Sequence, residues 1–234
     1  METIKIKSKV NSEIELSVMS GHFSSDRFHV NYYIDMSNLK MCMPEAQKVA
    51  AAMAKQYIKK VNIESKYMSQ LMEAGSLAQA ANVKPIDTII CMDGCEVIGA
   101  YLAEELTKAG LPRNSKNGNL YVVTPEFDNR GQMVVRRNIK DMIQGRNVLV
   151  VLASAMSGRT ITKAIGTILA YGGKVTGLSV IFGNIEEVDG YPVYSVFTQA
   201  DLPNFKLSDP EDCPDCKAGK KLDAVVNSYG YELF

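Results

Sequence analysis

The sequence predicts an α/β fold in which helices flank a parallel β-sheet. Three features of one stretch, residues 147–183, carry this prediction. Residues 148–152 form a continuous apolar run, too short for a helix and rich in β-branched side chains, which is typical of a strand buried on both faces. Residues 161–171 place apolar side chains at helical spacing, and residues 174–182 predict the next strand. Strand, helix and strand together form a βαβ unit.

A loop of small residues joins the first strand of this unit to its helix. The loop consists of Ala153, Ser154, Ala155, Met156, Ser157, Gly158, Arg159 and Thr160. Such a loop can direct backbone N–H groups and hydroxyls toward a phosphate at the helix N-terminus. An ordinary tight turn has the same composition, so composition alone leaves both interpretations open.

Length and composition narrow the class of protein. The 234 residues are enough for one α/β domain. Lys and Arg number 26, as do Asp and Glu, so bulk charge does not indicate binding to nucleic acid or to an anionic membrane. No apolar run approaches the roughly 20 residues of a membrane span, and the N-terminus lacks the apolar core of a signal peptide. Five cysteines, an odd number, argue against a disulfide framework, and we expect a cytoplasmic location.

The first 80 residues predict a hairpin followed by helices. Apolar residues alternate with polar ones on both sides of residues 9–12, which predicts a β-hairpin. Pro44 suits the first turn of a helix that we expect to run to Lys60. The apolar stripe of this helix is expected to pack in the core, and it consists of Val49, Met53, Tyr57 and Ile58. A second helix is expected over residues 67–80.

The rest of the chain alternates short apolar runs with turns. We expect strands at residues 87–91, 120–123, 132–135 and 193–197, and a helix at residues 96–109. The loop between the first of these strands and the helix consists of Met92, Asp93, Gly94 and Cys95. The segment after residue 200 is rich in Pro and Asp and predicts a long loop. Leu222, Val225 and Val226 then predict a short helix.

The loop around Gly158 resembles the loop that binds phosphoribosyl diphosphate (PRPP) in type I phosphoribosyltransferases. A Thr-Thr-Gly-Gly-Thr-like loop grips the 5-phosphate of PRPP in that family. Gly158 and Thr160 match it, Ser157 is a conservative change, and Met156 and Arg159 depart. The resemblance implies the family's parallel sheet flanked by helices, and a phosphate-binding loop over residues 154–160. It also implies one domain over residues 1–234, with a hairpin and hood (1–43), a core (84–200) and a C-terminal loop and tail (201–234) that helps to form the small hood.

Within this family, the chain resembles the orotate phosphoribosyltransferases most. Their hood covers the base site with a Gly-Phe-x-Leu-x-Ser-Gly-x-x-Ser-x-Tyr-Phe-like segment, and Phe23, Tyr32 and Tyr33 fall at suitable spacing. The resemblance therefore makes these three residues candidates for the base-site hood. It also places residues 92–95 where the family has its pyrophosphate loop, although an ordinary turn is the alternative interpretation of Asp93-Gly94.

Two family features are missing. The family carries two adjacent acidic residues just before the phosphate loop, which hold the ribose hydroxyls, and here Leu152 and Ala153 stand in their place. The basic loop of the orotate enzymes, an Arg-Lys-x-x-Lys-x-His-Gly-like pattern, is also absent. Arg130, Arg136 and Arg137 supply positive charge in that region, either to contact phosphates or simply as solvated surface residues.

The resemblance implies a ligand and two competing functions. The ligand would be PRPP or a related ribose 5-phosphate, and an active protein would transfer phosphoribosyl to a nucleobase such as orotate, with Mg²⁺ on the diphosphate. A homodimer is expected from the family. The missing acidic pair favours the second function, a ligand-binding or regulatory protein that has lost catalysis, and no catalytic residue can be named. A third hypothesis is an unrelated nucleotide-binding βα protein.

The C-terminal segment contains a Cys-x-x-Cys knuckle at Cys213 and Cys216. One knuckle supplies half of a structural zinc site, which usually needs four ligands. Asp209, Asp212, His22 or a second subunit could complete it. Two unpaired thiols or a redox pair are the alternatives.

Overall fold

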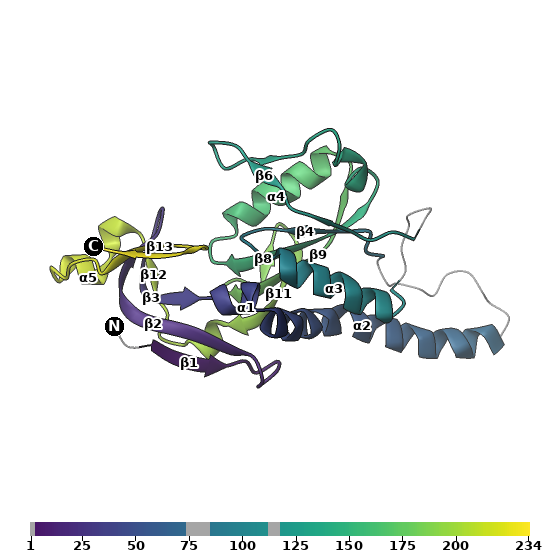
Figure 1. Ribbon diagram of the computed structural model, residues 1–234, viewed down its shortest axis with the longest axis horizontal. Helices are drawn as coiled ribbons and strands as arrows, with labels where there is room; N and C mark the ends of the chain where they lie inside the picture. The colour runs from purple at the N-terminus through teal and green to yellow at the C-terminus, as the bar shows by residue number, and fades with distance from the viewer. Residues whose placement is uncertain (1–2, 74–84, 112–117) are drawn as a thin grey trace.

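A computed structural model describes residues 3–73, 85–111 and 118–234. Figure 1 shows two regions: a core, in which helices lie on both sides of a sheet, and a smaller hood at one end, where both chain termini lie. No helix in the described part of the chain combines the length and the apolar composition needed to cross a membrane.

The core sheet has the strand order β10-β11-β9-β8-β4-β5. Its strands are β4 (Thr88–Cys91), β5 (Tyr121–Val123), β8 (Asn147–Ala155), β9 (Lys174–Gly183), β10 (Glu187–Val188) and β11 (Tyr191–Thr198). All neighbouring pairs are parallel except β10 with β11. Asp87 helps to align β4 with β8, because its carboxylate accepts hydrogen bonds from the backbone N–H (2.9 Å) and the side-chain amide (2.6 Å) of Asn147. The predicted parallel α/β sheet is confirmed.

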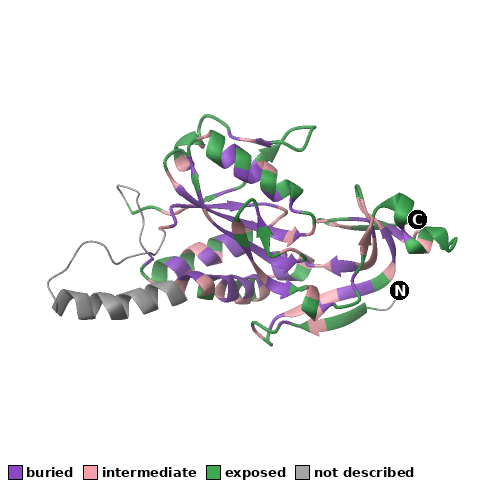
Figure 2. Cartoon of the chain, turned by 180° about the vertical axis from the view of Figure 1, so that it is seen from behind, coloured by how far each residue is buried: buried purple, intermediate pink, exposed green. Residues whose placement is uncertain are grey.

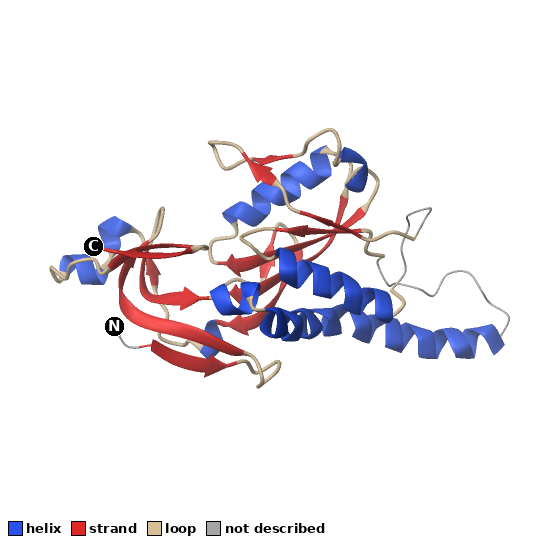
Figure 3. Cartoon of the chain, in the orientation of Figure 1, coloured by secondary structure: helices blue, strands red, loops and turns tan. Residues whose placement is uncertain are grey.

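Helices cover both faces of this sheet (Figures 1 and 3). α2 (Met43–Glu73) and α3 (Glu96–Lys108) pack on one face, and α4 (Arg159–Ala170) packs on the other. β8 alternates between the two faces, as a strand must. Leu149 and Val151 belong to the apolar cluster under α2 and α3, whereas Val150 and Leu152 belong to the cluster under α4. Figure 2 shows the resulting buried centre of the core.

The hood is a second sheet built from both ends of the chain. Its strand order is β12-β3-β2-β13-β14, and β1 pairs with β2 outside this order. The strands are β1 (Thr3–Lys7), β2 (Glu15–Ser24), β3 (His29–Asp35), β12 (Leu207–Ser208), β13 (Ala224–Asn227) and β14 (Gly230–Leu233). The antiparallel β1–β2 pair is the hairpin predicted from the sequence. The expected hood of N-terminal and C-terminal segments is therefore confirmed.

The remaining short elements lie in the connections between the strands of the two sheets. They are α1 (Ser37–Met41), β6 (Glu126–Phe127), β7 (Met133–Val134), α5 (Pro214–Lys217) and the 3₁₀ turns η1 (Lys140–Met142), η2 (Gln199–Asp201) and η3 (Pro210–Asp212). β6 and β7 form a hairpin over α4, where Gln132 donates a 2.6 Å hydrogen bond to the hydroxyl of Thr167.

Three predicted elements were wrong in part. α2 continues from Met43 to Glu73 because no Gly or Pro follows Pro44 within it, so residues 67–73 belong to this helix and residues 74–80 lie outside the described residues. The tail around Val225 and Val226 is strand β13 and not a helix, since its residues alternate between buried and exposed. β8 runs to Ala155, so Ala153, Ser154 and Ala155 lie in the strand and not in the loop.

Candidate functional site

The loop between β8 and α4 is short and exposed at its tip. Residues 156–158 form the bend, and Gly158 is the N-cap of α4 with φ 72°. Ser157, Arg159 and Thr160 are exposed, and no side chain of the described chain caps this helix end. Because the first N–H groups of a helix have no partner within it, and the helix dipole is positive there, this end can bind an anion.

Gly158 is required by the fold of this loop. Its positive φ favours glycine, and an added Cβ would lie 3.1 Å from Ile185 Cδ1 and 3.1 Å from Val188 Cγ2. A side chain at this position would therefore point into apolar neighbours and not toward a bound phosphate. Glycine here shapes the turn, and the exposed residues around it offer the polar groups.

The two positions of the missing acids are part of the apolar core. Leu152 is 1% exposed and Ala153 is 0% exposed. The Leu152 side chain packs in the cluster under α4, so it does not fill the space beyond the strand end. Neither side chain can accept a hydrogen bond from a ribose hydroxyl.

A second loop lies at the same edge of the sheet. It joins β4 to α3, and because β4 and β8 are parallel neighbours, their carboxyl ends and the loops that follow them lie together. Met92 and Cys95 are buried, whereas Asp93 and Gly94 are half-buried and have φ values of 57° and 79°. A non-glycine residue in this conformation is strained, as often occurs at functional sites.

The carboxyl group of Asp93 lies beside Ala153 of β8. Burial raises the pKa of Asp93, while the nearby charge of Lys40 and the backbone of Ala153 act in the opposite direction. Asp93 thus places a carboxyl group next to the strand position where the family has its acidic pair.

Lys40, in α1, is a buried charged residue that the sequence did not single out. It is 1% exposed, and its ammonium donates hydrogen bonds to the backbone carbonyls of Asp93 (2.9 Å) and of Ser228. It also lies 5.7 Å from the ring centroid of Tyr229. Ser228 and Tyr229 form the turn between β13 and β14, so Lys40 connects the hood to the β4–α3 loop. In the sequence, Lys40 is a single lysine in an apolar segment, and no motif there indicates its contacts with Asp93 and Ser228.

The other predicted site residues lie in two places. Phe23 and Tyr33 are buried in the apolar cluster of the hood, with ring centroids 6.3 Å apart, and Tyr32 is half-buried against the core cluster. Their role at a base site stays a prediction. Arg130, Arg136 and Arg137 are exposed in and after the β6–β7 hairpin.

Arg136 and Arg130 already contact protein groups. Arg136 donates two hydrogen bonds to one carboxylate oxygen of Glu126, at 2.9 and 2.6 Å. The backbone carbonyl of Arg130 accepts a 2.9 Å hydrogen bond from Lys163 of α4. The role of these arginines in phosphate binding stays a prediction.

Cys213 and Cys216 lie in the hood, beside His22 and His29. Of the partners considered from the sequence, His22 lies in this group, whereas Asp209 and Asp212 do not belong to it. His29 was missed as a partner.

Comparison with known proteins gives structural likenesses only. No protein-family model and no curated protein matches the chain. Similar solved structures include Mycobacterium tuberculosis orotate phosphoribosyltransferase in complex with Fe(III) dicitrate (18% identity, TM-score 0.44, 80% of this chain and 92% of that chain). Leishmania donovani UMP synthase (15%, TM-score 0.48, 80% and 34%) and Trypanosoma cruzi hypoxanthine phosphoribosyltransferase (16%, TM-score 0.42, 65% and 78%) are also similar.

Phosphoribosyltransferases are thus among the solved structures to which the chain is similar.

Proposed function

We propose that the chain binds PRPP or a related ribose 5-phosphate at the N-terminus of α4. The observation that carries this proposal is the turn at Gly158, which leaves the helix end uncapped and the hydroxyl residues Ser157 and Thr160 exposed at the carboxyl edge of a parallel sheet. The resemblance of this loop to the PRPP loop supports the choice of ligand. Backbone N–H groups, Ser157 and Thr160 would hold the 5-phosphate.

The β4–α3 loop would receive the diphosphate end of PRPP. The carboxylate of Asp93 suits Mg²⁺, which is commonly bound by one or two carboxylates together with substrate phosphates. Asp93 would hold the ion, and the ion would offset the charge of the diphosphate. The magnesium requirement, the choice of orotate as the base, the homodimer and a cytoplasmic location stay predictions from the sequence.

A second candidate function is binding without transfer. It is favoured by Leu152 and Ala153, which are buried and carry no acid. Asp93 does not fully replace such a pair, because it supplies one carboxyl group. We propose that the chain binds phosphate at the loop before α4 and transfers phosphoribosyl slowly or not at all.

The test of ligand binding is titration calorimetry with PRPP and Mg²⁺. Thr160→Val removes one hydroxyl next to the phosphate, and a hydrogen bond to a charged group contributes about 1.5–3 kcal/mol, so affinity should fall roughly 10- to 150-fold. Thr162→Val is the matched control, because Thr162 is exposed two residues further along the same helix. Absence of PRPP binding by the folded wild-type chain, or equal affinity in both variants, would contradict the proposal.

A further inference from the structure

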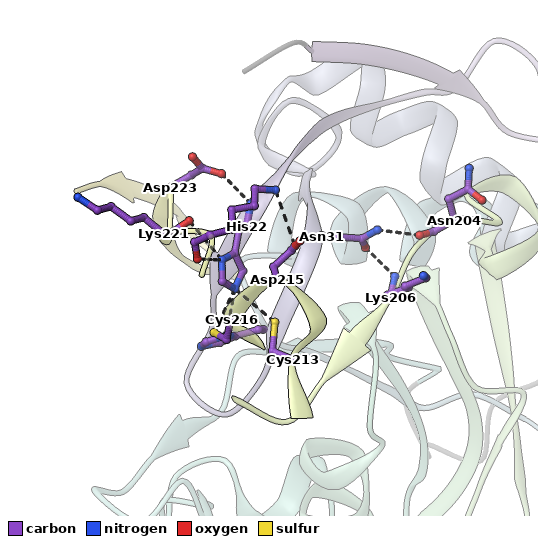
Figure 4. A network of polar contacts seen from close by, with 11 residues as sticks. His22, Asn31, Asn204, Lys206, Cys213, Asp215, Cys216, Lys221 and Asp223 are labelled. Atoms are coloured by element: carbon purple, nitrogen blue, oxygen red, sulfur yellow. Dashed lines mark hydrogen bonds and ion pairs between the residues drawn. The ribbon is translucent and has the colours of Figure 1, made fainter. Parts of the chain in front are cut away.

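Four potential metal ligands from distant parts of the chain meet in the hood. His22 lies in β2, His29 begins β3, Cys213 is the N-cap of α5, and Cys216 lies within α5. Figure 4 shows the two cysteine sulfurs directed toward the ring of His22. One ligand atom from each of the four residues lies within 4.8 Å of all the others, and three of the four residues are buried.

Four of the six distances between these ligand atoms, 3.2–3.6 Å, are close to the edges of a tetrahedron around one ion. Nε2 of His22 lies 3.2 Å from Nδ1 of His29, 3.3 Å from Sγ of Cys213 and 3.6 Å from Sγ of Cys216. Sγ of Cys216 lies 3.2 Å from Nδ1 of His29. Zinc bonds of about 2.0–2.1 Å to nitrogen and about 2.3 Å to sulfur give tetrahedral edges of roughly 3.3–3.8 Å. A two-iron cluster would bind the histidine pair on one iron and the cysteine pair on the other. It suits this group less well, because all four ligand atoms lie within 4.8 Å of one another, as around a single ion.

The surroundings of His22 favour its role as a ligand. Its Nδ1 lies 3.1 Å from the backbone carbonyl of Lys220 and 3.2 Å from that of Lys221. Since carbonyl oxygens only accept, Nδ1 carries the proton and Nε2 is left with a lone pair directed at the cluster. A ligating histidine commonly donates its other N–H to a carbonyl or carboxylate in this way.

The cluster also lies where the C-terminal segment attaches to the N-terminal strands of the hood. The C-terminal segment joins the hood through β12, which pairs with β3 over two positions, and through β13, which pairs with β2 over two positions, Ala224 with Phe23 and Val225 with Ser24. The backbone N–H of Asp223 donates a 2.8 Å hydrogen bond to the carbonyl of His22, whose own N–H donates to the Asp223 carboxylate. An ion held by β2, β3 and α5 would fasten the segment next to this short pairing.

We propose that His22, His29, Cys213 and Cys216 bind one Zn²⁺ ion, and that this ion fastens the C-terminal segment to the N-terminal strands of the hood. Two thiolates and two neutral imidazoles balance the charge of the ion, and an N₂S₂ tetrahedron is a common zinc site. Four protein ligands leave no position open for substrate, so the role is structural and independent of the phosphate loop.

The first test is the zinc content of the full chain, purified without chelators and measured by inductively coupled plasma mass spectrometry. We expect about one zinc per chain, and loss of most of it in Cys216→Ser and in His29→Gln. Cys42→Ser is the matched control, because Cys42 lies outside the cluster, and it should keep its zinc. Full zinc content in Cys216→Ser would overturn the proposal.

The second test uses only the wild-type chain, so it stands even where a variant does not fold. Zinc is removed with a chelator under reducing conditions, and Co²⁺ is added. The expected result is the strong visible absorption of tetrahedral cobalt together with a thiolate-to-cobalt band, and a higher melting temperature with metal than without. A wild-type chain that carries no metal and gives no such spectrum would overturn the zinc site, and a Cys213–Cys216 disulfide in that chain would favour a redox pair.

Discussion

The phosphate loop and the metal cluster differ in how the chain builds them. The loop takes its polar groups from neighbouring residues, 156–160, at the exposed end of one strand. The cluster takes its ligands from positions about 190 residues apart and encloses most of them. A site made of neighbouring residues can be recognised in the sequence, whereas a site made by the packing of distant segments needs the structure.

The largest effect should come from Gly158→Val. This substitution should affect the phosphate loop and leave the metal cluster unchanged. The positive φ and the contacts with Ile185 and Val188 should destabilise the core by about 2–4 kcal/mol, measured by urea unfolding. Zinc content should be unchanged, because the cluster lies in the hood. Gly166→Val is the control, since an added Cβ at Gly166 meets nothing within 4 Å. Equal losses in the two variants would contradict this account of the turn.

Lys40→Met should have an intermediate effect, because Lys40 joins the two regions. The substitution leaves the carbonyls of Asp93 and Ser228 without their donor, which we expect to cost about 1–3 kcal/mol after the relief of a buried charge is counted. Hydrogen exchange should speed up in the β13–β14 turn and in the β4–α3 loop alike. Lys55→Met, at an exposed position of α2, is the control. Faster exchange in only one of the two segments would show that Lys40 does not couple them.

The sequence predicted most of the core and less of the hood. The βαβ unit around Gly158 was recognisable because its strands are continuous apolar runs and its helix has a regular apolar stripe. Strand β13 was mistaken for a helix because Val225 and Val226 are too few to define a period. Their strand conformation comes from pairing with β14, over four positions, and with β2, some 200 residues earlier in the chain, over two.

The candidate site likewise combines residues that the sequence indicated with residues that only the structure identified. Ser157, Gly158 and Thr160 were found from a local pattern. Lys40 and His29 were missed because their partners lie far away in the sequence. Asp93 was placed in the correct loop, but its position beside Ala153 depends on the alignment of β4 with β8.

Arg136→Ala should have the smallest effect. Its guanidinium is exposed and already bound to Glu126, so PRPP affinity should change less than about fivefold. Arg137→Ala provides a comparison at the adjacent exposed position. A much larger loss of PRPP affinity in Arg136→Ala alone would bring this arginine into the phosphate site.

The most direct test of the central claim measures PRPP binding and phosphoribosyl transfer on the same preparation. Two charge-assisted hydrogen bonds of about 1.5–3 kcal/mol each, absent at Leu152 and Ala153, correspond to a rate loss of about 100- to 10,000-fold. We predict that calorimetry shows PRPP binding with Mg²⁺, while absorbance shows little or no consumption of orotate, with an active orotate phosphoribosyltransferase as the control. Turnover of about one per second or faster would contradict the claim, because another group, such as Asp93, would then do the work of the acidic pair.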